Sequence, residues 1–303
     1  MKNLRGTNAI VTGASRGIGI YIAKEMAGHG INLVLAARSA EALETVRRDC
    51  ERFGVRAIAV QCDVSSKDDL RRLVATAEQQ LGRVDILVNN AGIEIVEHLR
   101  YLSLEQIEDL MTINLDAPIW LTRMVLPAML DRRSGAIVNV ASLAGKGGVA
   151  FNSIYAASKH GLVGFSESLG IELDGTGVNV GVVCPGLVSD AGMWADHAAS
   201  GAKPGRLLTT VAPQKVADAV IRVINGTPEV IVNSGPSMKP LLAFGQFAPG
   251  LKRRVLRTMG VDKMFKAEAD RLKYGDDRPG KARPAAAQPR PEAAPEPVAS
   301  APE

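Results

Sequence analysis

The chain reads Ala9-Ile10-Val11-Thr12-Gly13-Ala14-Ser15-Arg16-Gly17-Ile18-Gly19 near its amino terminus, where a short apolar strand leads through three glycines into a helical stretch from Ile20 to about Gly28. Glycines permit a tight turn and a close approach of the backbone to a pyrophosphate. The helix amino terminus offers N–H groups and a positive dipole to the anion. The TGxxxGxG spacing predicts a dinucleotide-binding loop, with contacts from Gly13, Ser15, Arg16, Gly17, Ile18 and Gly19. The alternative is an ordinary strand-to-helix turn that contains three glycines.

Short apolar strands alternate with longer amphipathic stretches along the rest of the chain. This alternation predicts an α/β fold, a Rossmann-type doubly wound parallel β-sheet flanked by helices on both faces. The strands are apolar throughout, as expected when both faces of a sheet are covered. With 46% hydrophobic and 22% charged residues, the chain has enough apolar material for a sizeable core. The predicted strands are Ala9–Val11, Asn32–Ala36, Ala57–Gln61, Ile86–Val88, Ala136–Val140, Val178–Val183 and Val230–Val232.

The carboxyl-terminal part differs in composition, and we expect three regions. Residues 1–240 form the Rossmann domain, residues 241–275 form a basic helical extension, and residues 276–303 form a disordered Ala/Pro-rich tail. The tail has too little apolar surface to offset the entropy lost on ordering.

A basic amphipathic helix is predicted over Leu251–Met259 in the extension, followed by a second helix capped by Asp262. Such a helix either lies on an anionic membrane surface or packs on its own domain or a neighbouring subunit, and we favour packing. The apolar face has Leu251, Val255 and Met259, and the basic residues are Lys252, Arg253, Arg254 and Arg257.

Composition argues against several classes of protein. Cys50, Cys62 and Cys184 form no CxxC pair and no cluster at metal-ligand spacing, so we expect neither a disulfide framework nor a metal site. The amino terminus leaves no room for a signal sequence, and no uncharged apolar run reaches the roughly 18 to 20 residues that span a bilayer. The net charge of +4 is not concentrated on one face, which argues against nucleic acid as a partner. We therefore expect a cytoplasmic protein.

Arg38 follows the second predicted strand, where an NAD-binding chain usually has a carboxylate for the ribose 2′-hydroxyl. An arginine there can instead bind a 2′-phosphate, and Arg16 in the glycine loop can reach the same group. The two arginines predict NADP(H) in preference to NAD(H). The alternative is that Arg38 merely begins a solvated helix containing Glu41 and Glu44.

Asp63 and Val64 close the third predicted strand and are candidate cofactor contacts. The Asp63 carboxylate can accept a hydrogen bond from the adenine amino group. It can equally cap a helix over Ser65–Leu70, and both roles can coexist.

Tyr155 and Lys159 lie four residues apart in a predicted helix, so their side chains share one face about one turn apart. Tyrosine titrates near pH ~10, and proton exchange at neutral pH needs a nearby cation that favours the phenolate. Lys159 and an oxidised nicotinamide would both supply that charge. Ser142 follows the strand Ala136–Val140 at the sheet edge where ligands bind, and its hydroxyl can hydrogen-bond a substrate carbonyl. By itself Ser142 is typical of a surface residue at a strand end.

Asn114 lies in the predicted helical stretch Leu104–Leu130, which begins with the capping pattern Ser103-Leu104-Glu105-Gln106. Because Pro118 has no N–H, the Asn114 carbonyl loses its helical partner, and a local kink is expected. The freed carbonyl could hold a water that links Lys159 to solvent. The alternative is a harmless bent helix.

These residues together resemble the short-chain dehydrogenase/reductase superfamily, over about Asn3–Gly235. The matching motifs are TGxxxGxG at 12–19, Asp63, Asn89-Asn90-Ala91-Gly92, Asn114, Ser142, Tyr155 with Lys159, and Pro185-Gly186. The resemblance implies that residues 1–240 are the catalytic domain of an oxidoreductase. It implies Tyr155 as general acid/base, Lys159 lowering the pKa of Tyr155 and binding the nicotinamide ribose, Ser142 orienting the substrate, and Asn114 completing a proton relay.

The resemblance also implies further cofactor contacts and an assembly. Those contacts are Asn90, Ala91, Gly92, Pro185, Gly186 and Val188, and the assembly is a homodimer or homotetramer through the helices bearing Asn114 and Tyr155. One departure follows Pro185-Gly186, where family members commonly have a threonine that contacts the nicotinamide carboxamide. Here Ser189 or Asp190 would have to replace it.

The region Leu187–Thr210 is rich in Gly and Ala and resembles a flexible lid containing Met193, Trp194 and His197. Its apolar members predict a hydrophobic small-molecule substrate with a carbonyl or alcohol group. We interpret His197 as a solvated loop residue, and Glu94, Val96 and His98 as candidates for the opposite wall. A non-catalytic nucleotide sensor or scaffold with this fold is the alternative function, and the complete set of Ser142, Tyr155 and Lys159 favours the enzyme.

Overall fold

A single parallel sheet of seven strands runs through the part of the chain that the structure, a computed structural model, describes: residues 3–199, 209–233, 247–260 and 263–273. The strand order is β3-β2-β1-β4-β5-β6-β7, and every neighbouring pair is parallel. The predicted fold class is confirmed, and each predicted strand is present within two residues of its expected ends. The strands are β1 Asn8–Thr12, β2 Asn32–Ala37, β3 Ala57–Gln61, β4 Ile86–Asn89, β5 Gly135–Val140, β6 Val178–Pro185 and β7 Glu229–Val232.

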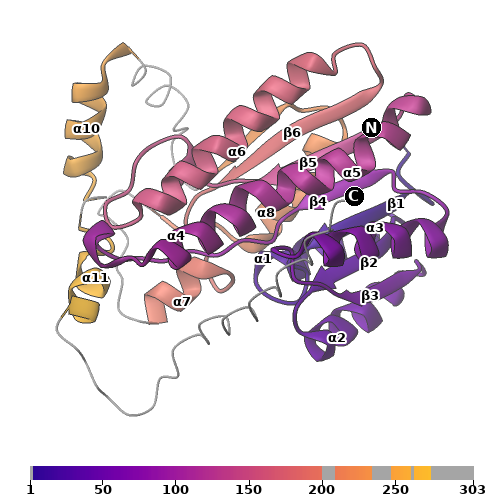
Figure 1. Ribbon diagram of the computed structural model, residues 1–303, viewed down its shortest axis with the longest axis horizontal. Helices are drawn as coiled ribbons and strands as arrows, with labels where there is room; N and C mark the ends of the chain where they lie inside the picture. Colours follow the sequence, from indigo (N-terminus) through magenta and orange to yellow (C-terminus); the bar gives the residue numbers. More distant parts are fainter. Residues whose placement is uncertain (1–2, 200–208, 234–246, 261–262, 274–303) are drawn as a thin grey trace, which may run out of the picture.

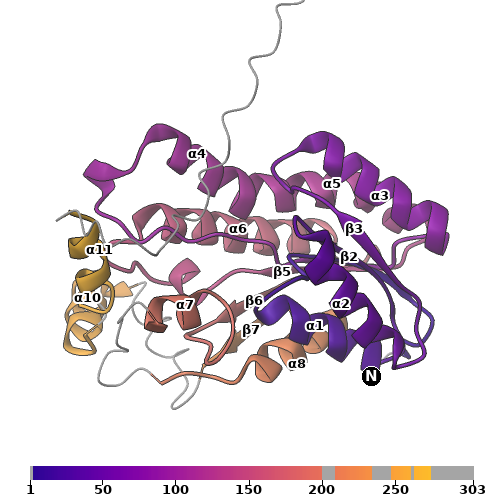
Figure 2. The ribbon, with the colours of Figure 1, turned by 90° about the horizontal axis from the view of Figure 1, so that it is seen from below.

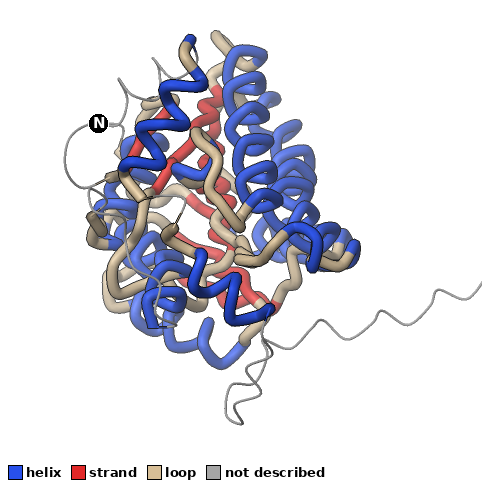
Figure 3. The backbone as a smooth tube through the Cα atoms, turned by 90° about the vertical axis from the view of Figure 1, so that its left-hand side faces the viewer, coloured by secondary structure: helices blue, strands red, loops and turns tan. Residues whose placement is uncertain are grey.

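Helices cover both faces of the sheet (Figures 1 and 2). Figure 3 shows the strands lying between two groups of helices. One face carries α1 (Ile18–Gly28), α2 (Ala40–Glu51) and α8 (Pro213–Ile224), and the other carries α3 (Lys67–Leu81), α5 (Ala117–Asp131) and α6 (Ser153–Glu172). The smaller helices are the 3₁₀ turns Leu99–Tyr101 and Leu143–Gly145, α4 (Leu104–Met111), α7 (Met193–Ala199), α10 (Pro249–Thr258) and α11 (Lys266–Lys273).

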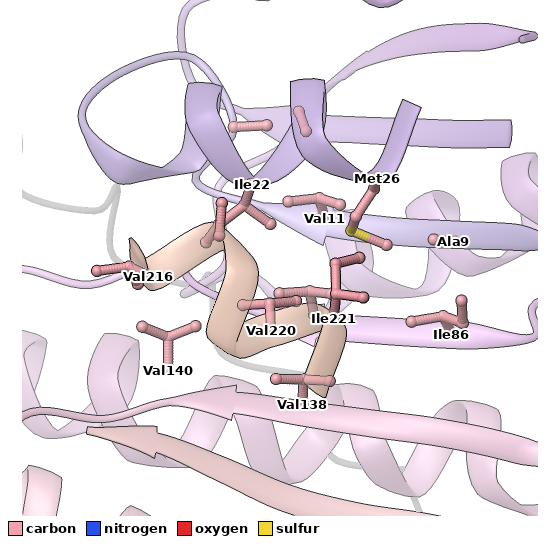
Figure 4. Packing of buried hydrophobic residues seen from close by; sticks show 14 of the residues in the cluster. Ala9, Val11, Ile22, Met26, Ile86, Val138, Val140, Val216, Val220 and Ile221 are labelled. Carbon is pink, nitrogen blue, oxygen red and sulfur yellow. The ribbon is translucent and has the colours of Figure 1, made fainter. Parts of the chain in front are cut away.

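The core on the first face is made where α1 and α8 pack on the central strands (Figure 4). Val11 on β1, Ile22 on α1 and Val220 on α8 are all completely buried. Burying side chains of this size stabilises the fold by about 1.5–3 kcal/mol each. The apolar strands of the sequence are therefore explained by cover on both sides of the sheet.

The order in which the chain adds strands to the sheet reverses at β1. Strands β2 and β3 lie to one side of β1, and β4 lies on the other. Ligands of open parallel sheets bind in the crevice outside the carboxyl ends of the strands at such a switch point. The glycine loop follows β1 and Gly92 follows β4, so both lie at this crevice.

The helical stretch Leu104–Leu130 is interrupted, as the position of Pro118 predicts. Helix α4 ends at Met111, a π-helical turn covers Thr112–Asp116, and α5 begins at Ala117. The capping box is present, because the Ser103 hydroxyl accepts from the Gln106 N–H and the Gln106 side chain accepts from the Ser103 N–H.

The predicted carboxyl-terminal regions are described only in part. Helices α10 and α11 lie within 241–275, whereas Asp262 and the tail 276–303 lie outside the described residues. Among the helices described, none combines the length and the apolar character needed to cross a membrane. The three domain boundaries stay predictions.

Candidate active site

A cavity of about 670 Å³ opens at the carboxyl ends of the strands. It is lined by residues that follow each of the seven strands, so segments far apart in sequence share one site. All predicted site residues except Gly19 and Asn114 line it: Gly13, Ser15, Arg16, Gly17, Ile18, Arg38, Asp63, Val64, Asn90, Ala91, Gly92, Ser142, Tyr155, Lys159, Pro185, Gly186 and Val188.

The glycine loop presents an open helix amino terminus to this cavity. Gly17 begins α1 with a φ of 58°, no side chain caps the helix, and its first turn contains no acidic residue. The first N–H groups and the positive end of the dipole are therefore available to an anion. A Cβ on Gly13 would lie 2.8 Å from the Cα of Ala91, so the loop packs directly on the segment after β4. These features fit a dinucleotide pyrophosphate.

Gly19 has a packing role, which explains why it does not line the cavity. A Cβ at this position would overlap the carbonyl oxygen of Gly13. The Thr12 hydroxyl supports the same loop by accepting from the N–H groups of Asn90 and Ala91, each at 3.0 Å.

Arg16 and Arg38 both line the cavity. Arg16 is 3.4 Å from Asp196 on α7, in an exposed pair with side chains 68% and 69% accessible. The carboxylate of Glu44 pairs with Arg47 and Arg48, not with Arg38. The two arginines can thus face a phosphate, although neither is fixed by a buried partner.

Asp63 shapes the turn after β3. Its Oδ1 accepts from the Ser65 N–H at 2.9 Å and from the Ser65 hydroxyl at 2.8 Å. The predicted helix cap is wrong in one respect, because Ser66, not Asp63, accepts from the Asp69 N–H at the start of α3. Contact between Asp63 and adenine stays a prediction.

Tyr155 and Lys159 face the cavity from the first turns of α6, as their spacing predicts. The Lys159 Nζ donates to the carbonyl oxygen of Val140 at 3.1 Å and lies 5.7 Å from the centroid of the Tyr155 ring. Both residues are buried, with exposed fractions of 7% for Tyr155 and 3% for Lys159. Helix α6 thus brings a phenol and an ammonium to the end of β5, next to Ser142.

Burial controls the proton affinities of this pair. It raises the pKa of Tyr155 above its usual value, the charge of Glu94 raises it further, and a hydrogen bond with Ser142 opposes both effects. Burial lowers the pKa of Lys159 to about 8, against the attraction of Glu94. In the protein chain alone, desolvation disfavours the phenolate. The lowering of the Tyr155 pKa by Lys159 and an oxidised nicotinamide stays a prediction.

Asn114 lies behind the cavity wall and is fully buried. Its side-chain amide donates to the Ile93 carbonyl at 2.9 Å and to the Ser158 hydroxyl at 3.2 Å, and it accepts from the Ile93 N–H at 2.9 Å. A Cβ on Gly92 would lie 3.1 Å from the Asn114 Oδ1 and 3.4 Å from the Lys159 Nζ. Gly92 therefore keeps the space between these two polar groups open.

Neither candidate for the missing threonine lines the cavity. The Ser189 N–H and hydroxyl both donate to the Val211 carbonyl, at 2.9 and 3.4 Å. Asp190 has a left-handed φ of 57°. The turn after Val188 thus directs Ser189 into backbone pairing, and a contact of Ser189 or Asp190 with the carboxamide stays a prediction.

The lid region is described except for residues 200–208. Met193, Trp194 and His197 of α7 line the cavity, as does Glu94 from the segment after β4. His98 does not line it, and Val96 is buried in a cluster with Trp194. The interpretation of His197 as a solvated residue is wrong, because its side chain is only 12% exposed and lies between Glu94 and Glu268.

Four residues of the carboxyl-terminal extension line the cavity, although no sequence motif points to them. We call them the C-terminal wall: Leu256, Met259, Met264 and Phe265. The predicted apolar face of α10 is only partly right, because Met259 is buried whereas Leu251 is 49% exposed. Leu256 of α10 and Met259 after it thus contribute to the cavity wall. Leu256 and Met259 are three residues apart, so the sequence could have indicated that they share a helix face. It does not indicate what that face contacts.

Known proteins similar to this chain agree with this geometry. A family model described as short chain dehydrogenase matches residues 7–200. The ketoacyl reductase HetN of Nostoc sp. is 44% identical over 281 residues, which cover 91% of this chain and 97% of that protein. A crystal structure of a variant actinorhodin polyketide ketoreductase with NADPH has 35% identity and a TM-score of 0.69, and the match covers 76% of this chain and 96% of that one. A metagenomic short-chain oxidoreductase in complex with NADP has 34% identity and a TM-score of 0.66, with 78% and 100% covered.

Proposed function

Because this chain belongs to the short-chain dehydrogenase family, and is thus an NAD(P)-dependent oxidoreductase acting on carbonyl and alcohol carbons, we propose that it reduces the keto group of a hydrophobic ketoacyl substrate with NADPH. The observation that carries the proposal is the convergence of Ser142, Tyr155 and Lys159 on the cavity that also contains the glycine loop.

The preference for NADPH rests on Arg16 and Arg38. Both line the cavity, and arginine binds phosphate through charge-assisted hydrogen bonds. The two similar solved structures contain NADPH and NADP. When bound, the cofactor supplies a hydride to the substrate carbonyl carbon.

The chain's own residues position and protonate the substrate oxygen. The hydroxyls of Ser142 and Tyr155 hold the keto oxygen, and Tyr155 donates its proton to that oxygen as the alcohol forms. A raised pKa keeps the phenol protonated at neutral pH, so the group is ready to act as an acid in the direction of reduction. Lys159, whose pKa of about 8 leaves it charged at neutral pH, stabilises the phenolate that remains.

The ketoacyl class is supported by the lining of the cavity and by the names of similar proteins. Apolar side chains from α7 and from the C-terminal wall line the same cavity as Tyr155. HetN is named as a ketoacyl reductase, and the first similar structure is a polyketide ketoreductase. An acyl chain with a keto group matches both the apolar wall and the hydroxyl pair.

The test is NADPH oxidation with a panel of 3-oxoacyl thioesters, simple ketones and aldehydes. We expect turnover with 3-oxoacyl thioesters in the wild type and a loss of about 100-fold or more in Tyr155→Phe. Tyr101→Phe is the matched control, since Tyr101 is 48% exposed and lies outside the cavity. Equal turnover by wild type and Tyr155→Phe would contradict the role of the phenol. Absence of turnover in both proteins would support the alternative of a nucleotide sensor.

Assembly, location and membrane contact stay predictions. A homodimer or homotetramer through the helices bearing Asn114 and Tyr155 can be tested by light scattering. Contact between residues 241–275 and a membrane predicts salt-sensitive binding to anionic vesicles that is lost on truncation after residue 239. The burial of Met259 leaves fewer apolar side chains of α10 for such contact.

A further inference from the structure

His197 on α7 lies between two carboxylates from distant parts of the chain. Its Nδ1 is 2.9 Å from both carboxylate oxygens of Glu268 on α11, and its Nε2 is 3.1 Å from the Oε2 of Glu94. Both ring nitrogens can donate only in the protonated imidazole, so this geometry fits an imidazolium. Burial alone would lower the pKa of His197, but the hydrogen bonds to Glu268 and Glu94 outweigh it and raise the pKa to about 10.

An aromatic cluster lies beside this bridge. The ring of His197 packs edge to face on the ring of Phe265, with 5.2 Å between their centroids. The ring of Trp194 packs on the Phe265 ring in the same way, at 6.0 Å. Trp194, Met264 and Phe265 are buried together. Trp194 and His197 lie three residues apart on α7 and therefore share one face, so α7 contacts α11 through both charge and apolar packing.

A second contact between a histidine and a carboxylate joins α11 to the segment after β4. The His98 Nε2 is 3.3 Å from Asp270, and the His98 ring packs on Phe151 at 4.9 Å. The two pairs connect the segment after β4, helix α7 and the carboxyl-terminal extension, which are separated by up to 172 residues in sequence. Figures 1 and 2 show α7, α10 and α11 together at one end of the molecule.

The residues that line the cavity come both from the strand ends and from the carboxyl-terminal extension. Arg38, Gly13 and Gly92 follow β2, β1 and β4, and these strand ends are the expected place of the dinucleotide. Met264 and Phe265 enter the cavity from the extension and have no counterpart among the predicted cofactor contacts. Their part of the cavity is therefore the space left for the substrate.

We propose that the C-terminal wall binds the acyl chain of the substrate, and that Glu268 is a positioning residue that holds this wall in place through His197 and Glu94. The inference rests on the proposed ketoacyl reductase function and specifies its substrate: an acyl chain long enough to extend from the keto group at Tyr155 to Phe265. Methionine side chains such as Met259 and Met264 adapt to apolar ligands of different shape, which suits a chain-binding surface.

Glu268→Ala tests the binding of the acyl chain without altering the catalytic residues, because Glu268 does not line the cavity. The variants Glu268→Ala and Glu268→Gln are compared with wild type in NADPH oxidation with the N-acetylcysteamine thioesters of 3-oxobutanoate and 3-oxodecanoate. Glu25→Ala is the matched control, since its carboxylate is 3.1 Å from the His29 Nε2 on α1, outside the site.

We expect Glu268→Ala to raise the KM for the ten-carbon substrate about tenfold, equivalent to losing the burial of roughly two methylene groups. The KM for the four-carbon substrate and both kcat values should change by less than about twofold, because the short chain does not reach the wall. Glu268→Gln retains an oxygen that accepts from the imidazolium, so it should restore part of the ten-carbon KM. Glu25→Ala should match wild type with both substrates.

A spectroscopic measurement checks the same contact without turnover. The chain has two tryptophans, and Trp120→Phe leaves Trp194 as the reporter. In this background Glu268→Ala should shift the Trp194 emission to longer wavelength, as the ring loses its cover by Phe265.

The outcomes distinguish the inference from the function on which it rests. Equal KM changes for the two chain lengths, or no change together with unaltered Trp194 emission, would overturn the inference while leaving the reductase function standing. Absence of wild-type turnover with either thioester would overturn the proposed function and the inference with it.

Discussion

The ammonium of Lys159 lies over the ring of Tyr155, 5.7 Å from its centroid. It contacts the carbonyl oxygen of Val140 at 3.1 Å and has no carboxylate within ion-pair distance among the residues that the structure describes. A buried charge in this state costs free energy, which is why the pKa of Lys159 falls to about 8. The positive charge is thus held beside the phenol at neutral pH and is lost at modestly alkaline pH.

Lys159→Met should reduce kcat for ketone reduction by about 100-fold or more, because the phenolate formed at Tyr155 loses its nearby cation. In the wild type the rate should fall as pH rises through about 8, where Lys159 loses its proton. The variant should lack this step in its pH–rate profile, measured between pH 6 and pH 10. Lys24→Met is the control, since Lys24 pairs with Asp49 at 2.7 Å outside the cavity. A decline near pH 8 that survives in Lys159→Met would assign that titration to another group.

Arg38→Ala should raise the KM for NADPH by about tenfold or more and leave the KM for NADH nearly unchanged, because the lost contact is to the 2′-phosphate. Steady-state kinetics with both cofactors measure the ratio. Arg48→Ala is the control, since Arg48 is an exposed arginine on α2 that pairs with Glu44. An equal rise in the KM for NADPH and for NADH would mean that Arg38 supports the loop and does not bind the 2′-phosphate.

Gly92→Ala tests the space between Asn114 and Lys159. The added Cβ would lie 3.1 Å from the Asn114 Oδ1 and 3.4 Å from the Lys159 Nζ, so one of the two groups must move by a few tenths of an ångström. We expect kcat to fall about tenfold because misplacement of this size at a reacting centre lowers the rate steeply. Gly164→Ala on α6 is the control, since nothing lies within 4 Å of its Cβ position. Unchanged activity in Gly92→Ala would show that Asn114 and Lys159 need no fixed spacing.

The parts of the site that could be predicted from sequence are those set by local geometry. Tyr155 and Lys159 share a helix face because they are four residues apart, and the glycine loop follows its strand directly. The kink before Pro118 is equally local, and it appears as the π-helical turn Thr112–Asp116.

The parts that could not be predicted depend on packing between distant segments. His197 was interpreted as solvated because its partners Glu94 and Glu268 are 103 and 71 residues away, and no local pattern joins them. Phe265 enters the cavity for the same reason, through contact with Trp194 on α7. The turn that directs Ser189 to Val211 also depends on a residue 22 positions later.

His197→Gln tests the charge of the bridge through the stability of the fold. The folded-state pKa of His197 is raised from 6.5 to about 10. A raised pKa contributes stability that is fully present below the unfolded value and is lost as pH rises through the folded value. The free energy of unfolding should therefore differ between wild type and His197→Gln by on the order of 3 kcal/mol at pH ~6, as for removal of one partner of a buried ion pair. The difference should shrink between about pH 6.5 and pH 10.

Urea unfolding at pH 6, 8 and 10 measures this difference, with His29→Gln as the control. His29 also pairs with a carboxylate, at 3.1 Å from Glu25, but its side chain is 37% exposed and it lies only four residues after Glu25, at the end of α1. Exposed pairs of this kind contribute at most about 1 kcal/mol, so the control should show only a small difference at every pH. A difference for His197→Gln that stays constant from pH 6 to pH 10 would show that the imidazole is neutral in the folded protein, and that packing on Phe265, not charge, accounts for its place between the two glutamates.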